Sequence, residues 1–169
     1  MKRSNIVLIG MPGAGKSTVG VILAKLTSRE FIDTDILIQT DQRRSLQDIV
    51  DREGHLALRK IEETIILRLS LQNHVIATGG SAAYSEPAMI HLKTHGVVVF
   101  LDVNLPSLEA RVHNFGSRGL ARRPDQTFAD LFHERYSLYE KYADLRIKCS
   151  AMNQEDVCAE IINRAGPIT

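Results

Sequence analysis

The chain is poor in cysteine, carries almost no net charge and has no long apolar run. Its two cysteines, Cys149 and Cys158, have no histidines beside them at metal-ligand spacing. We expect no disulfide between them, because no export signal precedes the first strand-like run. They are therefore interpreted as thiols of the core or the surface.

The small net charge of +1 gives no overall field that would attract nucleic acid or a membrane surface. No apolar run is long enough to span a bilayer. We therefore expect a cytoplasmic protein with neither nucleic acid nor membrane as a partner. The six histidines show no ligand spacing and are interpreted as surface or loop residues; they are His55, His74, His91, His95, His113 and His133.

What is present suits one domain with a substantial core. The chain has 169 residues, of which 44% are hydrophobic and 24% charged. No repeat, low-complexity tract or linker divides it. We expect a single domain over residues 1–169 and a monomer.

Residues 10–17 read G-M-P-G-A-G-K-S, which is the phosphate-binding loop pattern G-x-x-x-x-G-K-S. The β-branched run before it predicts a buried strand, and the apolar spacing over 18–26 predicts a helix after it. Glycines let successive N–H groups face one anion, and the helix start adds its positive dipole end. Lys16 can then reach the outer phosphates, and the Ser17 hydroxyl can join a Mg²⁺ shell. The alternative is a plain glycine turn.

Strand-like and helical runs alternate along the whole chain, which predicts an α/β fold. We expect a three-layer P-loop NTPase with a five-stranded parallel sheet and helices on both faces. The expected strands lie near 5–10, 30–34, 74–78, 96–102 and 144–148, and the expected helices near 18–26, 45–53, 56–71, 106–112, 128–142 and 155–164. Ligands of such sheets bind beyond the carboxyl ends of the strands.

Two aspartates, Asp33 and Asp35, follow the second expected strand. One can lie near a metal through water, while the other meets a substrate hydroxyl that must lose its proton during phosphoryl transfer. The alternative is that Asp35 caps a helix beginning at Ile36. The P-loop one strand earlier favours the functional interpretation.

Arg59 and Glu62 stand three residues apart on the helix expected over 56–71. They could form a solvated ion pair of small energetic value. Alternatively, Glu62 could steer the Arg59 guanidinium toward a substrate carboxylate. Gly79 and Gly80 follow the third strand, where they could form a tight turn or admit a ligand close to the backbone.

Residues 113–125 contain two glycines, a proline and three arginines without a helical apolar stripe. This composition is typical of a mobile cationic lid that closes over ATP and excludes water. A solvated basic loop is the alternative. The three arginines are Arg118, Arg122 and Arg123.

The P-loop, Asp33-Thr34-Asp35, Glu53-Gly54 with Arg59 and Glu62 after it, and Thr78-Gly79-Gly80 resemble shikimate kinases in order and spacing. The resemblance covers nearly the whole chain. It implies a nucleoside-monophosphate-kinase-like fold, with ATP and Mg²⁺ as cofactors. It also implies transfer of the ATP γ-phosphoryl group to a hydroxyl of shikimate, giving shikimate 3-phosphate.

The resemblance also implies the site residues, within a substrate-binding helical region at about 35–62 and the lid at about 113–125. The implied catalytic residues are Lys16, Asp35 and Arg118. The implied nucleotide-binding residues are Gly13, Ala14, Gly15, Lys16, Ser17, Thr18, Arg111 and Arg118. The implied substrate-binding residues are Asp35, Arg59, Gly80 and Arg135, and the implied metal-side residues are Ser17 and Asp33.

The chain departs from the family pattern at two positions. Ser81 stands where the family usually has a third glycine, so its β-carbon is expected to narrow the substrate space or re-aim the turn. Gly119 stands where a proline commonly follows the lid arginine, and Arg122 or Arg123 could replace Arg118. These departures leave open a kinase of another small hydroxy acid or polyol. A regulatory nucleotide-binding module without catalysis is the other alternative.

Overall fold

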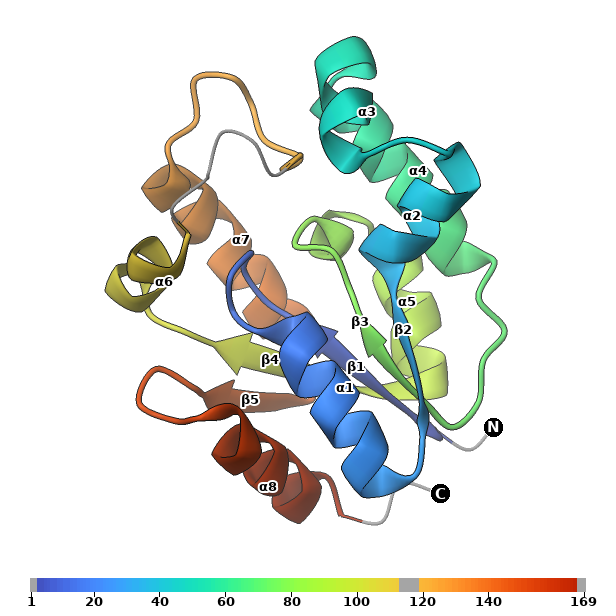
Figure 1. The fold of residues 1–169 in the computed structure, drawn as a ribbon, viewed down its shortest axis with the longest axis vertical. Coiled ribbons are helices and arrows are strands. Elements are labelled where there is room, and N and C mark those ends of the chain that lie inside the picture. Colours follow the sequence, from blue (N-terminus) through green and yellow to red (C-terminus); the bar gives the residue numbers. More distant parts are fainter. Residues whose placement is uncertain (1–2, 113–118, 167–169) are drawn as a thin grey trace.

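The computed structural model describes residues 3–112 and 119–166, and five strands form one parallel sheet in the order β2-β3-β1-β4-β5 (Figure 1). The central strand β1 pairs with β3 on one side and β4 on the other, so that Val7 lies between Ile76 and Val98. All five expected strands are confirmed. They are β1 (Asn5–Ile9), β2 (Glu30–Asp33), β3 (His74–Ala77), β4 (Gly96–Asp102) and β5 (Leu145–Lys148).

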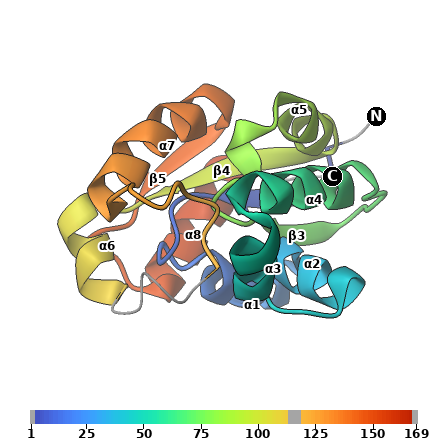
Figure 2. The ribbon, with the colours of Figure 1, turned by 90° about the horizontal axis from the view of Figure 1, so that it is seen from above.

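Helices cover both faces of the sheet, which confirms the three-layer architecture. Helices α1 and α8 pack on one face, and α5 and α7 cover the other (Figure 2). Helices α2, α3 and α4 gather beyond the β2 side, and α6 follows β4. The bounds are α1 (Lys16–Thr27), α2 (Thr34–Gln42), α3 (Leu46–Glu53), α4 (His55–Leu67), α5 (Glu86–His95), α6 (Leu105–Arg111), α7 (Phe128–Tyr142) and α8 (Gln154–Ala165), with a 3₁₀ turn η1 (Ala82–Tyr84).

The centre of the main core is formed by β1, β3 and β4, whose side chains are buried on both faces because helices cover both. A second, smaller hydrophobic cluster lies among α2, α3 and α4 and includes Ala121 from the described part of the expected lid. That segment is therefore packed against the group of helices that the sequence assigned to substrate binding. The cluster consists of Ile38, Ile49, Leu58, Ile65 and Ala121.

Three helical features differ from the sequence prediction. Helix α5 was not expected, although Ser85 caps it through the Ala88 N–H and a proline follows in its first turn. The turn η1 was not expected either. Helix α4 ends at Leu67 rather than near residue 71, because the chain there turns toward β3.

His74 shows that the interpretation of the histidines as surface or loop residues was wrong for one of them. It is the first residue of β3 and only 9% exposed, and its Nδ1 lies 2.7 Å from the Gln72 carbonyl oxygen. His55, His91, His95 and His133 lie in helices. His113 lies outside the described residues.

The two cysteines are buried free thiols, one after β5 and one in α8. Burial raises the pKa of Cys149 to about 12 and that of Cys158 to about 11. Both are thus core residues of low reactivity. Within residues 3–112 and 119–166, no helix is long and apolar enough to cross a membrane.

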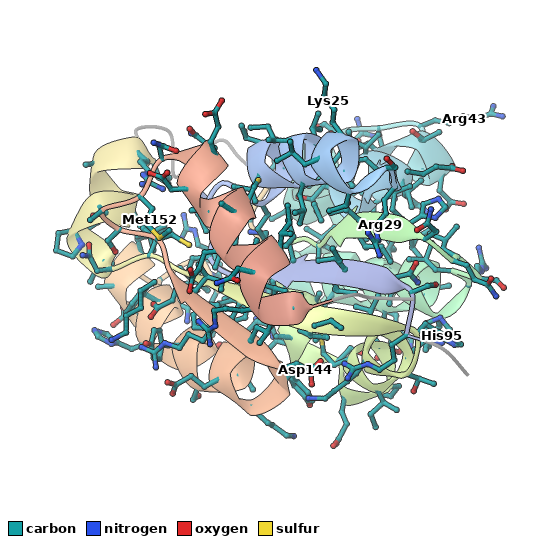
Figure 3. The ribbon with its side chains drawn as sticks, turned by 90° about the horizontal axis from the view of Figure 1, so that it is seen from below. Lys25, Arg29, Arg43, His95, Asp144 and Met152 are labelled. Carbon is teal, nitrogen blue, oxygen red and sulfur yellow. The ribbon has the colours of Figure 1, made fainter. Side chains whose placement is uncertain are left out.

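Asp144 ties the amino ends of β4 and β5 together and is labelled in the view from below (Figure 3). It accepts hydrogen bonds from the Val98 N–H at 2.9 Å and from the Arg3 guanidinium, and it pairs with Lys93 at 3.0 Å. Its pKa is lowered by these hydrogen bonds against the effect of burial. This polar cluster secures the sheet at the ends opposite the P-loop.

Candidate active site

The P-loop joins β1 to α1 and closes around its own lysine. Gly13 and Gly15 have φ of 83° and 93°, a conformation that residues with a β-carbon rarely adopt. The Lys16 ammonium group donates to the carbonyl oxygens of Gly10 and Met11 at 2.8 and 2.9 Å. The glycines thus permit the turn, and the lysine holds the turn in its curved form.

Lys16 is 9% exposed, and burial lowers its pKa to about 8, against the opposing effect of Asp35. It is therefore still mostly protonated at neutral pH. Next to it, the Ser17 hydroxyl donates to the Asp33 carboxylate. A positive charge and a hydroxyl–carboxylate pair therefore stand side by side at the start of α1.

The residues at this point fit a Mg²⁺ ion that takes most of its ligands from phosphate groups and water. Mg²⁺ accepts hydroxyl and carboxylate oxygens and usually keeps several waters. Ser17 and Asp33 supply one oxygen donor of each kind. In the part of the chain that the structure describes, no group of three or more His, Cys, Asp or Glu residues could hold a metal alone.

A cavity of about 310 Å³ opens over the P-loop. Arg111, at the end of α6, reaches its edge and donates to the Gly13 carbonyl oxygen at 3.5 Å. Of the described residues that the resemblance assigned to nucleotide binding, only Ala14 and Arg111 do not line the cavity. Its lining consists of Pro12, Gly13, Gly15, Lys16, Ser17, Thr18, Asp35, Thr78, Gly80 and Leu120.

Asp35 lies in the first turn of α2, and Asp33 is the cap of that helix. The Asp33 carboxylate accepts the Asp35 N–H at 2.9 Å, and the helix begins at Thr34. The alternative that Asp35 caps a helix beginning at Ile36 is therefore wrong. Because Asp33 supplies the cap, the Asp35 side chain is available to the cavity.

Burial and the neighbouring Asp33 raise the pKa of Asp35 to about 6, while Lys16 and Arg135 oppose that rise. Asp35 is thus mostly ionised at neutral pH and remains able to accept a proton. It lines the large cavity and also a second cavity of about 40 Å³ beside it. The lining of the second cavity is Asp35, Ile38, Leu46, Leu58, Glu62, Gly79, Gly80, Ser81, Gly119, Leu120, Ala121 and Arg135.

Gly80 leaves no room for a side chain. A β-carbon there would lie 2.7 Å from Arg135 Nη1 and 3.0 Å from Pro12 Cδ. The Tyr139 hydroxyl donates to the Gly80 carbonyl oxygen at 2.6 Å. The glycine pair does form a turn, with the Ala82 N–H donating to Gly79, and that turn also brings the backbone up to the cavity.

Two guanidinium groups converge on one oxygen atom. Arg135 is 1% exposed and donates to the Ala121 carbonyl oxygen at 2.8 Å, and Arg59 donates to the same oxygen at 3.3 Å. The Arg59 guanidinium lies 3.5 Å from the ring centre of Tyr84. The structure thus brings the two predicted arginines together, although Arg59 itself lines a neighbouring cavity rather than the one shared with Asp35.

The predicted contact between Arg59 and Glu62 is wrong, because these two described side chains form no ion pair with each other. Binding of a substrate carboxylate by Arg59 stays a prediction. Glu62 is 2% exposed, and its carboxylate accepts a hydrogen bond from the Ser81 hydroxyl. Burial and Asp35 raise the pKa of Glu62 to about 7, and the Ser81 hydrogen bond partly counteracts this. The sequence did not reveal the Ser81 contact, nor the placement of Tyr84 under Arg59.

Arg118 and residues 113–117 lie outside the described residues, so the lid prediction is tested only in its last part. Arg122 donates to the carbonyl oxygens of Pro124 and Gln126, and Arg123 pairs with Glu134 at 3.2 Å. Neither arginine lines the cavity over the P-loop. The proposal that one of them replaces Arg118 gains no support from this arrangement.

The sequence and the fold are both similar to those of known proteins. The profile of the shikimate kinase family matches residues 12–165. The chain belongs to the shikimate kinase family. Shikimate kinases from Rippkaea orientalis and Sulfurihydrogenibium sp. are 38% and 34% identical to it, over 94% and 95% of this chain and 86% and 96% of theirs.

A solved structure supports the same membership. The shikimate kinase from Acinetobacter baumannii, solved in complex with shikimate, superposes with a TM-score of 0.88 and is 32% identical. The match covers 96% of this chain and 92% of that one. The fold class and the family expected from the motifs are thus both confirmed.

Proposed function

We propose that the chain transfers the γ-phosphoryl group of ATP to a hydroxyl of shikimate, giving shikimate 3-phosphate. One observation carries this proposal: Asp35 lines both the cavity over the P-loop and the smaller cavity in front of Arg135. A carboxylate at the junction of a donor cavity and an acceptor cavity can orient the hydroxyl that attacks the phosphoryl group. Membership of the shikimate kinase family independently supports the same reaction.

On the donor side, the P-loop N–H groups and Lys16 hold the β- and γ-phosphates, and Arg111 borders the nucleotide. Ser17 would hold Mg²⁺, and Asp33 would contact it through water. When bound, Mg²⁺ neutralises charge on the phosphate oxygens. Gly13, Ala14, Gly15 and Thr18 complete the phosphate cradle.

On the acceptor side, Asp35 accepts a hydrogen bond from the attacking hydroxyl and takes its proton as the new P–O bond forms. Arg59, Arg135 and the Gly80 backbone bind the substrate carboxylate. Both guanidinium groups already converge on the Ala121 carbonyl oxygen, which is the contact that a carboxylate oxygen would replace.

Binding of the acceptor thus requires the segment at residues 119–121 to shift away from the arginines. Leu120 lines both cavities, so its position after the shift decides how much water reaches the phosphoryl group. Arg118 is assigned to the charge of the transferring phosphoryl group on the resemblance alone. Catalysis then rests on positioning and electrostatic stabilisation, with proton transfer to Asp35.

A coupled ADP-release assay over a panel of acceptors tests the proposal. We expect turnover with shikimate and none with gluconate or homoserine. Turnover with one of the latter but not with shikimate would identify a related kinase. ATP binding without turnover on any acceptor would favour a regulatory module.

A further inference from the structure

Ser81 occupies the place where the family usually has a glycine, and the backbone there needs no glycine. Its φ of −95° and ψ of −4° suit any residue, and it precedes η1 as the cap position. The expectation that its β-carbon narrows the substrate space or re-aims the turn stays a prediction. The hydroxyl donates to the Glu62 carboxylate, and Ser81 itself is 8% exposed.

Glu62 has one oxygen engaged and one free. Its Oε2 accepts from Ser81, whereas its Oε1 is buried without a hydrogen-bond partner. Burying an unsatisfied carboxylate oxygen costs stability, so such an atom in a cavity wall points to a ligand or a water that satisfies it. Arg59, on the same helix, does not supply that partner and lies over Tyr84 instead.

Glu62 and Asp35 both line the acceptor cavity. A β-carbon at Gly79 would lie 2.4 Å from Glu62 Oε1 and 2.6 Å from Asp35 Oδ1. The two carboxylate oxygens therefore border the same small space over Gly79, where a larger residue could not stand. An acceptor with two adjacent hydroxyls could donate one to each carboxylate.

We propose that Ser81 is a positioning residue that holds Glu62 so that its free oxygen accepts a second hydroxyl of the acceptor, next to the hydroxyl that Asp35 binds. This inference rests on the proposed function and extends it from the reacting hydroxyl to its neighbour. In shikimate that neighbour is the hydroxyl adjacent to the phosphorylated position. The chain would thereby select an acid that carries a vicinal diol.

The charges around Glu62 explain why a hydroxyl donor is needed there. Asp35 from α2 disfavours a negative charge on Glu62, while Arg135 from α7 and Lys16 from α1 favour it. The Ser81 hydrogen bond also favours the negative charge, and it lowers the pKa of Glu62 toward its ordinary value. Without that hydroxyl, a larger fraction of Glu62 is protonated at neutral pH.

The decisive experiment combines Ser81→Ala with a substrate that lacks the second hydroxyl. The KM values for ATP, shikimate and 4-deoxyshikimate are measured in the wild type, in Ser81→Ala and in Ser81→Thr. Ser137→Ala, which removes an exposed hydroxyl from α7, serves as the matched control. Thermal unfolding of each variant shows whether it is folded.

We expect Ser81→Ala to raise the KM for shikimate about tenfold, the effect of losing a hydrogen bond to a charged group. The KM for ATP should stay unchanged, Ser81→Thr should retain most of the affinity, and 4-deoxyshikimate should not distinguish the variant from the wild type. The fall of kcat/KM for shikimate at acidic pH should begin at higher pH in Ser81→Ala, because Glu62 then binds its proton more tightly.

Two outcomes would overturn the inference while the proposed function stands. One is an unchanged KM for shikimate in folded Ser81→Ala. The other is an equal rise for shikimate and 4-deoxyshikimate. If the wild type does not phosphorylate shikimate at all, the proposed function itself is wrong. This result is distinct from the two outcomes that contradict only the role of Ser81.

Discussion

The Gly119 N–H donates to the Gln47 side-chain oxygen at 2.6 Å and so joins the expected lid segment to helix α3. Gly119 has φ of 61°, and a β-carbon there would lie 2.4 Å from the Gln47 backbone nitrogen. Proline cannot adopt this conformation and has no N–H to donate. The glycine that departs from the family pattern is therefore what permits this contact.

Gln47→Ala should remove the hydrogen bond that joins Gly119, in the expected lid, to α3. We expect faster hydrogen exchange of the Gly119 amide and an increase of about fivefold in the KM for the acceptor, the size of one ordinary hydrogen bond. Gln42→Ala, which changes a half-buried glutamine at the end of α2, is the control. Unchanged exchange at Gly119 in Gln47→Ala would show that the contact does not hold the lid.

Arg59→Lys should separate the effect of the positive charge from that of the planar guanidinium group in binding the acceptor carboxylate. Lysine keeps the positive charge but loses the planar fork and the stacking on Tyr84. We expect the KM for the acceptor to rise by at least about tenfold, a loss of the size of one charge-assisted hydrogen bond, while the KM for ATP stays within about twofold. Arg52→Lys on the exposed side of α3 is the control. Equal changes in both KM values would remove Arg59 from acceptor binding.

Gly80→Ala should disturb both cavities at once. The added carbon would lie 2.7 Å from Arg135 Nη1 and 3.0 Å from Pro12 Cδ, and neither neighbour is the exposed end of a flexible side chain. We expect a loss of about 1–3 kcal/mol in the free energy of unfolding and a large loss of turnover. At Gly166 a β-carbon meets nothing within 4 Å but φ is 64°, so Gly166→Ala measures the cost of backbone strain away from the site. Wild-type turnover in Gly80→Ala would contradict the described packing.

The free energy of unfolding should depend on pH through Glu62. Its pKa is raised from 4.5 to about 7, so the folded chain binds more protons than the unfolded chain between these values. Stability therefore falls as the pH rises through this window and stays lower above it. Relative to Glu62→Gln, the wild type should lose a few kcal/mol, roughly 3 at most, between pH 4.5 and 8. Denaturant unfolding of both proteins across this range measures the difference, and parallel curves would contradict it.

The strands and the P-loop could be predicted from the sequence because their signals are local. The buried strand before residue 10 and the glycines at 13 and 15 carry most of the information about that turn. The sequence signal for helix α5 is weaker. Its capping serine and first-turn proline are present, but its apolar stripe is short. Helix α2 was considered only as an alternative, beginning at Ile36 with Asp35 as its cap, whereas it begins at Thr34 with Asp33 as its cap.

The acceptor side could be predicted only in part, because its contacts join distant segments. The sequence indicated Arg59 and Arg135, but not that both reach the carbonyl oxygen of Ala121. The partner of Glu62 was placed on its own helix, three residues away, whereas the structure places it on the loop after β3. No local pattern distinguishes these possibilities, because the sheet topology alone brings Ser81 to α4.

The most direct measurement follows the label from [γ-³²P]ATP in a single turnover with shikimate, in the wild type and in Asp35→Asn. Asp41→Asn, which changes an exposed carboxylate of the same helix, is run beside them. We predict that the wild type and Asp41→Asn place the label on shikimate. Asp35→Asn should bind ATP and transfer at least about a hundredfold more slowly, as expected for loss of a general base. Transfer at the wild-type rate by Asp35→Asn, or label in inorganic phosphate alone, would contradict a carboxylate that joins donor and acceptor.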